Sequence, residues 1–261
     1  MLTAAIGLPL VVWLVRLRSP RWFFLLVALA VVLAVLELFN LAERQGIHPH
    51  RLTGVCGSVL VASSFLAGGP DLGLVLAVFA VAAPLASLVG RQGFAEALPS
   101  IATTMFGLLF VGLLLGYQVG LRSTEGSGPA LVFFLLWVVW LSDTAAYYVG
   151  TLLGKRPLSP RLSPHKTVEG TLAGMVAAVL AAASGKVWLL ERISWPHALA
   201  LGVVLGAFAL AGDLCESLLK RGSQVKDSGD WLPGHGGMLD RTDSLLFTAP
   251  ILYHYWKWFH D

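Results

Sequence analysis

One polar stretch near the C-terminus, residues 212–244, gathers acidic and basic side chains that are scarce in the rest of the chain. Its first part continues an apolar run, and four polar residues recur there at a spacing that places them on one face of a helix. Two carboxylates and a cation then point the same way, beside an apolar run in which a charge costs about 2.5–3.5 kcal/mol on insertion scales. A solvated helix end with intrahelical ion pairs is the alternative. The four residues are Asp213, Glu216, Ser217 and Lys220.

The middle of this stretch, residues 226–237, contains one proline and four glycines and cannot be helical throughout. A tight loop of this kind exposes backbone N–H groups, which suit phosphate oxygens. Gly236 and Gly237 are among the glycines that would present these groups, and the side chains of Lys226 and His235 would add donors. The loop therefore predicts phosphate binding, and an ordinary turn is the alternative.

Further aspartates lie at the start of an apolar segment or inside one. Asp240 and Asp243 stand three residues apart where the last apolar segment begins, with Arg241 between them. Helix capping is an alternative there, because the helix dipole favours acids at an N-terminus. Asp143 lies well inside an apolar run, where a carboxylate usually faces a cavity or a partner and marks a functional site. A structural polar contact with a facing helix is the alternative for Asp143.

A second polar loop, residues 151–169, is basic and leads through Glu169 into the next apolar segment. We interpret it as a lid that binds phosphate. A basic loop lying on the membrane surface is the alternative. The basic residues of this loop are Lys155, Arg156, Arg161 and Lys166.

The composition explains what must position these residues. The chain has 261 residues, of which 56% are hydrophobic and 13% charged, whereas a soluble domain carries about 25% charged residues. Apolar runs recur throughout, and about 18 such residues can cross the ~30 Å hydrocarbon core. We therefore predict an all-α, polytopic integral membrane helical bundle without strands, since an open sheet edge cannot be satisfied in lipid. About nine transmembrane segments are expected, near residues 2–15, 22–42, 52–67, 72–89, 100–118, 130–150, 169–190, 197–219 and 244–259.

Charge gives a partial orientation. The two long polar loops lie on one side of the predicted bundle, and the positive-inside rule places that side in the cytoplasm. With nine segments, the arginines of residues 16–21 would then lie outside, against the same rule. The net charge is +3, and the basic residues lie in loops without the interleaved aromatic residues of a nucleic-acid surface. No nucleic-acid partner is therefore expected. We expect residues 1–128 to form supporting, lipid-facing helices and residues 129–261 to form a catalytic region.

Together, these residues predict acids from separate helices meeting cations near one membrane face. Carboxylate oxygens suit Mg²⁺ rather than zinc. Mg²⁺ with several cations is typical of phosphoryl or nucleotidyl transfer, in which positioning and charge stabilisation do most of the work. From the residues alone, we predict a membrane enzyme that acts on a phosphorylated substrate.

The polar stretch also resembles a known signature. Residues 217–221 read SLLKR, residues 226–229 read KDSG and residues 232–243 read LPGHGGMLDRTD. This gapped pattern resembles the signature of the phosphatidate cytidylyltransferases, or CDP-diacylglycerol synthases. The upstream segments SPHKTVEG, residues 163–170, and WLSD, residues 140–143, are also similar to motifs of that family. The resemblance covers about the C-terminal half of the chain.

The resemblance implies an activity and a setting. The reaction would be CTP with phosphatidate giving CDP-diacylglycerol and pyrophosphate, a step of phospholipid biosynthesis. The implied site is Mg²⁺-dependent and opens to the cytoplasm, with two metal positions, one of which could hold K⁺. The metal aspartates carry over onto Asp213 and Asp240. A homodimer among membrane lipids is also implied, and we expect it in a bacterial inner membrane.

The resulting mechanism hypothesis gives the polar residues three roles. Catalytic roles are assigned to Asp143, Asp213, Lys226, Asp227 and Asp240. Phosphate binding is assigned to Lys166, Lys220, Arg221, His235, Gly236, Gly237 and Arg241. Orientation of these groups is assigned to Glu169, Glu216, Ser217 and Asp243.

Other functions remain compatible with parts of the pattern. The same chemistry on another membrane lipid phosphate is one, because lipid-tail identity is not written in the signature. An ion or solute transporter that uses the buried acids is another, although a path would need its charges spread through the depth of the membrane. A structural scaffold that keeps a decayed site is the third, and the complete polar set argues against it.

Overall fold

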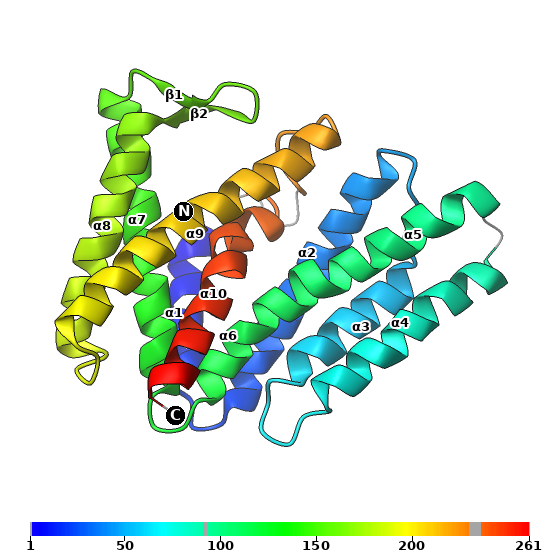
Figure 1. The fold of residues 1–261 in the computed structure, drawn as a ribbon, viewed down its shortest axis with the longest axis horizontal. Helices are drawn as coiled ribbons and strands as arrows, with labels where there is room; N and C mark the ends of the chain where they lie inside the picture. Colours follow the sequence, from blue (N-terminus) through cyan, green and yellow to red (C-terminus); the bar gives the residue numbers. More distant parts are fainter. Residues whose placement is uncertain (1, 91–92, 230–235, 261) are drawn as a thin grey trace. The chain divides into compact units, whose positions relative to one another are not determined.

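The computed structural model describes residues 2–90, 93–229 and 236–260. Helices make up nearly all of this part of the chain, which confirms the prediction of a helical protein (Figure 1). The helices are α1 Leu2–Arg16, α2 Pro20–Glu43, α3 Arg51–Ser63, α4 Leu72–Val89, α5 Phe94–Gly107, the π-helix η1 Leu108–Leu113, α6 Leu114–Ser123, α7 Gly128–Leu153, α8 Val168–Trp188, α9 Trp195–Gly222 and α10 Leu239–Phe259.

Among the described residues, six helical segments are long and apolar enough to span a membrane, so the expected count of nine is not confirmed. Helix α3 has 13 residues, and at about 1.5 Å per residue it is shorter than the ~30 Å hydrocarbon core. Helix α10 has 21 residues, but its histidine, its two tyrosines and its charged residues lower its hydropathy. The six segments are Pro20–Glu43, Leu72–Val89, Phe94–Ser123, Gly128–Leu153, Val168–Trp188 and Trp195–Gly222.

A short β-hairpin interrupts the otherwise helical chain and differs from the expectation of no strands. Strands β1, Pro157–Ser159, and β2, Ser163–Thr167, pair antiparallel between α7 and α8. The hairpin lies in the basic polar loop, outside the apolar helices. Its open edges are therefore not subject to the constraint that lipid imposes on strands. It carries Lys166, the residue predicted to bind phosphate from this loop.

The described residues form two compact units. Unit 1 comprises Met1–Ser123 with Leu219–Thr242, and unit 2 comprises Thr124–Leu218 with Asp243–Asp261. Each unit therefore includes part of the polar stretch near the C-terminus. The expected support and catalytic regions, 1–128 and 129–261, are a division by function, which these units leave as a prediction.

Glycines allow close helix packing in unit 1. Phe39 of α2 is fully buried, and its ring occupies space beside Gly54 of α3 and Gly107 of α5. A Cβ atom would lie 2.4 Å from that ring at Gly54 and 2.7 Å from it at Gly107. These glycines therefore let α2, α3 and α5 close around one aromatic side chain.

Helices α7 and α8 run side by side in unit 2 (Figure 1). A Cβ atom on Gly170 of α8 would lie 2.6 Å from the carbonyl oxygen of Ala146 in α7. A Cβ atom on Gly202 of α9 would lie 2.6 Å from Cα of Val179 in α8. Small residues thus bring the three helices close together, as is common between helices in lipid.

Candidate active site

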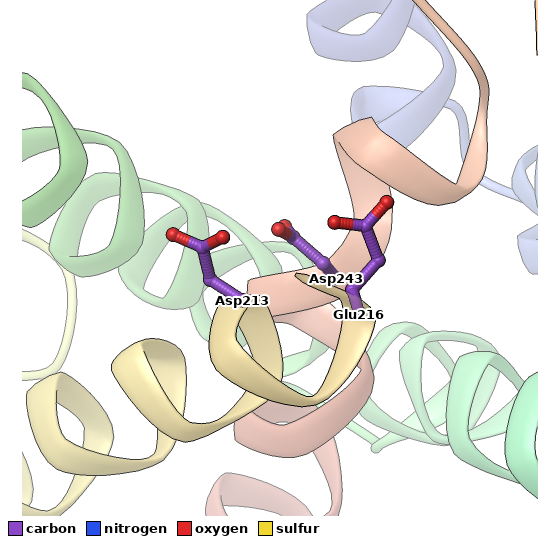
Figure 2. A group of neighbouring side chains, drawn as sticks. All are labelled: Asp213, Glu216 and Asp243. Carbon is purple, nitrogen blue, oxygen red and sulfur yellow. The ribbon is translucent and has the colours of Figure 1, made fainter. Parts of the chain in front are cut away.

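Three carboxylates face one another in unit 2. Asp213 and Glu216 lie one turn apart on α9, and Asp243 lies in the first part of α10 (Figure 2). One oxygen from each side chain lies within 4.8 Å of the others. Glu216 is buried, and Asp213 and Asp243 are half-buried. Such close like charges are unfavourable unless a cation or a proton is shared among them.

A glycine on α9 allows this arrangement. Gly212 is buried against α10, and a Cβ atom there would lie 2.4 Å from the carbonyl oxygen of Asp243. The next residue of α10, Ser244, donates from Oγ to the carbonyl oxygen of Ala209 at 3.4 Å, one turn before Gly212 on α9. The sequence Gly-Asp at 212–213 therefore joins the close helix contact directly to the first of the three acids.

The β-hairpin brings a cation to the same acids. The ammonium group of Lys166 forms an ion pair with the carboxylate of Asp213. The side chain of Lys166 is 23% exposed and that of Asp213 is 34% exposed, so the pair is partly shielded from solvent. Three residues that are far apart in the sequence, Asp143, Lys166 and Asp213, line one cavity in unit 2.

This cavity has a volume of about 370 Å³ and combines polar and apolar walls. Its apolar lining includes Met175 of α8 and Leu210 of α9, both from candidate membrane spans. Its polar lining includes Asp143, His165 and Lys166. Pockets that bind ligands are typically apolar with a few convergent polar groups, and this combination suits a ligand with a charged head and an apolar body.

The three facing carboxylates also fit a hard divalent cation. Mg²⁺ takes oxygen ligands at about 2.0–2.1 Å, so any two ligand oxygens of one ion lie no more than about 4.2 Å apart. The observed limit of 4.8 Å is close to this separation, and Mg²⁺ usually keeps several water ligands. Small side-chain movements, or one ligand acting through water, would complete such a site.

Asp240 has different surroundings, in unit 1. One of its carboxylate oxygens accepts from Lys220 Nζ at 2.5 Å. The other accepts from the backbone N–H groups of Ser228, at 3.1 Å, and Gly237, at 2.9 Å, and also lies 2.9 Å from Ser228 Oγ. Gly237 has no room for a side chain, since a Cβ atom would lie 2.0 Å from Ser228 Oγ. Asp240 thus binds residues from both described parts of the loop at residues 226–237, Ser228 and Gly237.

The remaining predicted residues lie in several settings. Glu169 accepts hydrogen bonds from the backbone N–H groups of Lys155 and Arg156, so it ties the start of α8 to the chain after α7. Ser217 is buried on α9. Gly236 has a left-handed φ of +73°. Four charged residues have exposed side chains: Arg221, Lys226, Asp227 and Arg241.

The geometry of the described residues does not test two parts of the sequence prediction. His235 lies outside the described residues. Asp213 and Asp240, the pair expected to hold metal, belong to different units, so their pairing stays a prediction. Within unit 2, Asp213 is instead grouped with Glu216 and Asp243, which the sequence prediction had treated as supporting residues.

The sequence prediction missed one buried acid, Glu37 of α2. Its carboxylate contacts the same segment that surrounds Asp240. The available signal was a charged residue well inside an apolar run, which is the signal that had identified Asp143.

Comparison with known proteins places the whole chain in one group. Residues 1–259 match the model of the cytidylyltransferase family. A phosphatidate cytidylyltransferase of Bacillus subtilis is 43% identical over 145 residues, which cover 56% of this chain and about half, 54%, of that protein. One from Synechocystis is 32% identical over 292 residues, 97% of this chain and 94% of that protein. Chloroplastic phosphatidate cytidylyltransferase 5 of Arabidopsis thaliana is 33% identical, covering 97% of this chain and 70% of that protein.

Proposed function

The chain belongs to the cytidylyltransferase family, and from this premise we propose that it transfers the cytidylyl group of CTP to phosphatidate. The products are CDP-diacylglycerol and pyrophosphate. The observation that carries the proposal is the cavity in unit 2, where Asp143, Lys166 and Asp213 meet apolar walls from membrane helices. Its polar groups suit phosphate, and its apolar walls suit a lipid. The names of the relatives supply the identity of the two substrates.

The proposed reaction is one in-line displacement. A phosphate oxygen of phosphatidate attacks the α-phosphorus of CTP, a new P–O bond forms, and the bond from the α-phosphorus to the bridging oxygen breaks. The electron pair of that bond leaves with pyrophosphate. A phosphate monoester has a second pKa of about 6 and is largely ionised near neutral pH, so no strong general base is required.

Lys166 is the residue best placed to bind a phosphate in the cavity. Its ammonium group already lies beside a carboxylate oxygen of Asp213, and an entering phosphate would offer it further oxygen acceptors. Asp143 lines the same cavity and would complete its polar wall. Lys220, Arg221, Lys226, His235 and Arg241 are proposed to bind further phosphate oxygens, with the N–H groups of Gly236 and Gly237.

Asp213, Glu216 and Asp243 are proposed to hold Mg²⁺. When bound, Mg²⁺ would neutralise charge on the triphosphate and on the departing pyrophosphate. The resemblance suggests Asp213 with Asp240 as an alternative pair, and a second cation position that K⁺ could occupy. Asp227, Glu169 and Ser217 would then orient the binding groups rather than contact the metal.

The setting is also part of the proposal. Six helical segments among the described residues can span a membrane, so the protein is a membrane protein. We propose that it is a homodimer in a bacterial inner membrane, with the active site facing the cytoplasm. That side supplies CTP, and it is the side that the positive-inside rule indicates for the two basic loops.

The test is product formation by the purified protein in detergent. Radiolabelled CTP is supplied with and without phosphatidate, and with and without Mg²⁺. A lipid-soluble product that requires both supports the proposal. A panel of other lipid phosphates tests the alternative substrate class, since a faster reaction with one of them would replace phosphatidate. Ion flux in liposomes without CTP, together with no product from any lipid, would favour a transporter and overturn the proposal.

A further inference from the structure

We propose that Glu37 is a positioning residue that holds the Asp240 segment in its working conformation. The inference rests on the proposed cytidylyl transfer for its catalytic meaning, but its geometry lies entirely in unit 1. The segment in question is residues 228–229 and 236–240, here called the Asp240 segment. Glu37 belongs to α2, nearly 200 positions earlier in the chain.

The carboxylate of Glu37 binds this segment with both oxygens. Oε1 accepts from the backbone N–H of Met238 at 2.8 Å. Oε2 accepts from the backbone N–H of Leu239 at 2.8 Å, and it lies 2.9 Å from Ser228 Oγ. All three donors that Glu37 meets within the described part of the chain thus come from the Asp240 segment.

The shape of the segment is fitted to this side chain. A Cβ atom on Gly229 would lie 2.9 Å from Glu37 Oε1, and one on Gly237 would lie 2.5 Å from Glu37 Oε2. Two of the glycines that predicted phosphate binding therefore also make room for a buried carboxylate. A substitution at either position would displace Glu37 or the segment.

Glu37 also fixes where α10 begins. Met238 and Leu239 stand at the start of α10, where backbone N–H groups have no partner within the helix. A carboxylate from another helix satisfies two of these donors, and the helix dipole favours its negative charge there. Asp240 follows directly, so fixing the first residues of the helix also fixes the backbone of Asp240.

Ser228 links the two carboxylates. Its hydroxyl oxygen lies 2.9 Å from Glu37 Oε2 and 2.9 Å from Asp240 Oδ2. The Asp240 carboxylate is in turn bound to Lys220 Nζ at 2.5 Å. A change at Glu37 is therefore expected to reach Asp240 and Lys220 through Ser228, without any direct contact between Glu37 and those residues.

The burial of Glu37 indicates that the contact is specific. Its exposed fraction is 0%, and it lies well inside the apolar helix α2, where a charge is unfavourable without good partners. A helix that served only as apolar support would be more stable with leucine at this position. Outer groups that orient functional residues typically change activity about 10- to 100-fold when removed.

The experiment compares Glu37→Gln with a matched control on the same helix, Glu43→Gln. Glu43 is partly exposed and bonds Arg51 rather than the Asp240 segment. Wild type and both variants are purified in detergent, the monodisperse fraction is taken, and kcat and KM for CTP and phosphatidate are measured per folded molecule. Hydrogen–deuterium exchange of the Gly237, Met238 and Leu239 amides is measured on the same samples.

Glu37→Gln is expected to lower kcat/KM about 10-fold or more and to speed exchange of these amides, because glutamine replaces one acceptor oxygen with a donor. Glu43→Gln should change neither quantity. Ser228→Ala should also lower kcat/KM, while the hydrogen bonds from the Met238 and Leu239 N–H groups to Glu37 stay in place. The double variant should lose little more than Glu37→Gln alone, because both changes break one chain of contacts.

Wild-type kcat/KM and wild-type exchange in folded Glu37→Gln would overturn the inference. A loss of folded protein with unchanged kcat/KM per folded molecule would also overturn it, since that result indicates a purely structural role. If the wild type itself forms no CDP-lipid, the proposed function fails instead. The exchange comparison then decides by itself whether Glu37 holds the Asp240 segment.

Discussion

In unit 2 the carboxylates of Asp213, Glu216 and Asp243 face one another (Figure 2), whereas in unit 1 those of Glu37 and Asp240 face N–H and O–H donors. The first arrangement concentrates negative charge and suits a cation. In the second arrangement the carboxylates accept hydrogen bonds from a backbone segment, which suits holding that segment in place. The same residue type thus has different expected roles, and the neighbouring groups rather than the sequence motif distinguish them.

The largest effect is expected at the facing carboxylates. Asp213→Asn removes the charge that both Lys166 and a cation would use, so kcat should fall about 100-fold or more. The measurement is turnover at saturating CTP and phosphatidate, with size-exclusion chromatography confirming a folded protein. Near-normal turnover by the folded variant would remove Asp213 from the site.

Loss of the cavity cation should have the next largest effect. Lys166→Met keeps an apolar stem but removes the ammonium group, and kcat/KM should fall about 30-fold because the cavity loses its bond to a phosphate oxygen and a partly shielded charge pair loses one partner. Lys186→Met is a matched control at the other end of α8, where the ammonium group bonds the carbonyl oxygen of Glu191. Equal losses in the two variants would argue against phosphate binding by Lys166.

A measurement of Mg²⁺ affinity tests which of the two units holds the metal. Mg²⁺ at 100 times its Kd should stabilise the folded wild type by about 2.7 kcal/mol, seen as a rise in Tm. Glu216→Gln should raise the Mg²⁺ concentration needed for half of this rise about 10-fold. A larger effect of Asp240→Asn than of Glu216→Gln would favour the Asp213–Asp240 pair and contradict the assignment to unit 2.

The smallest effect is expected at a glycine of unit 1. In Gly237→Ala the new methyl group would meet Ser228 Oγ and Glu37 Oε2, so the segment must shift and kcat/KM should fall about fivefold. Gly222→Ala is the control, since its methyl group would meet only Gln45 Nε2, at 3.7 Å. Unchanged kinetics in Gly237→Ala would show that the segment tolerates displacement.

The helices and the enzyme family could be predicted from the sequence, because apolar runs and a long gapped signature are both local patterns. The number of spans could not, since the apolar segment at residues 52–67 forms the 13-residue helix α3. The β-hairpin was missed because its strands have three and five residues within a polar loop. Pattern alone does not separate such strands from irregular structure.

The site was predictable as a set of residues but not as an arrangement. The motifs identified Asp143, Lys166 and Asp213, yet only the fold brings α7, the β-hairpin and α9 together around one cavity. Glu37 was missed because the N-terminal half carried no motif. Its partners, Ser228, Met238 and Leu239, lie about 190 to 200 residues later, a separation that periodicity cannot reveal.

The most direct test of the central claim follows the position of the radiolabel in CTP. Purified protein is incubated with phosphatidate and Mg²⁺, using CTP labelled either at the α-phosphorus or at the γ-phosphorus. Cytidylyl transfer predicts that the α-label enters the lipid and the γ-label is released as pyrophosphate. A γ-label in the lipid would indicate phosphoryl transfer from CTP, and no label in the lipid from either position would contradict the proposed function.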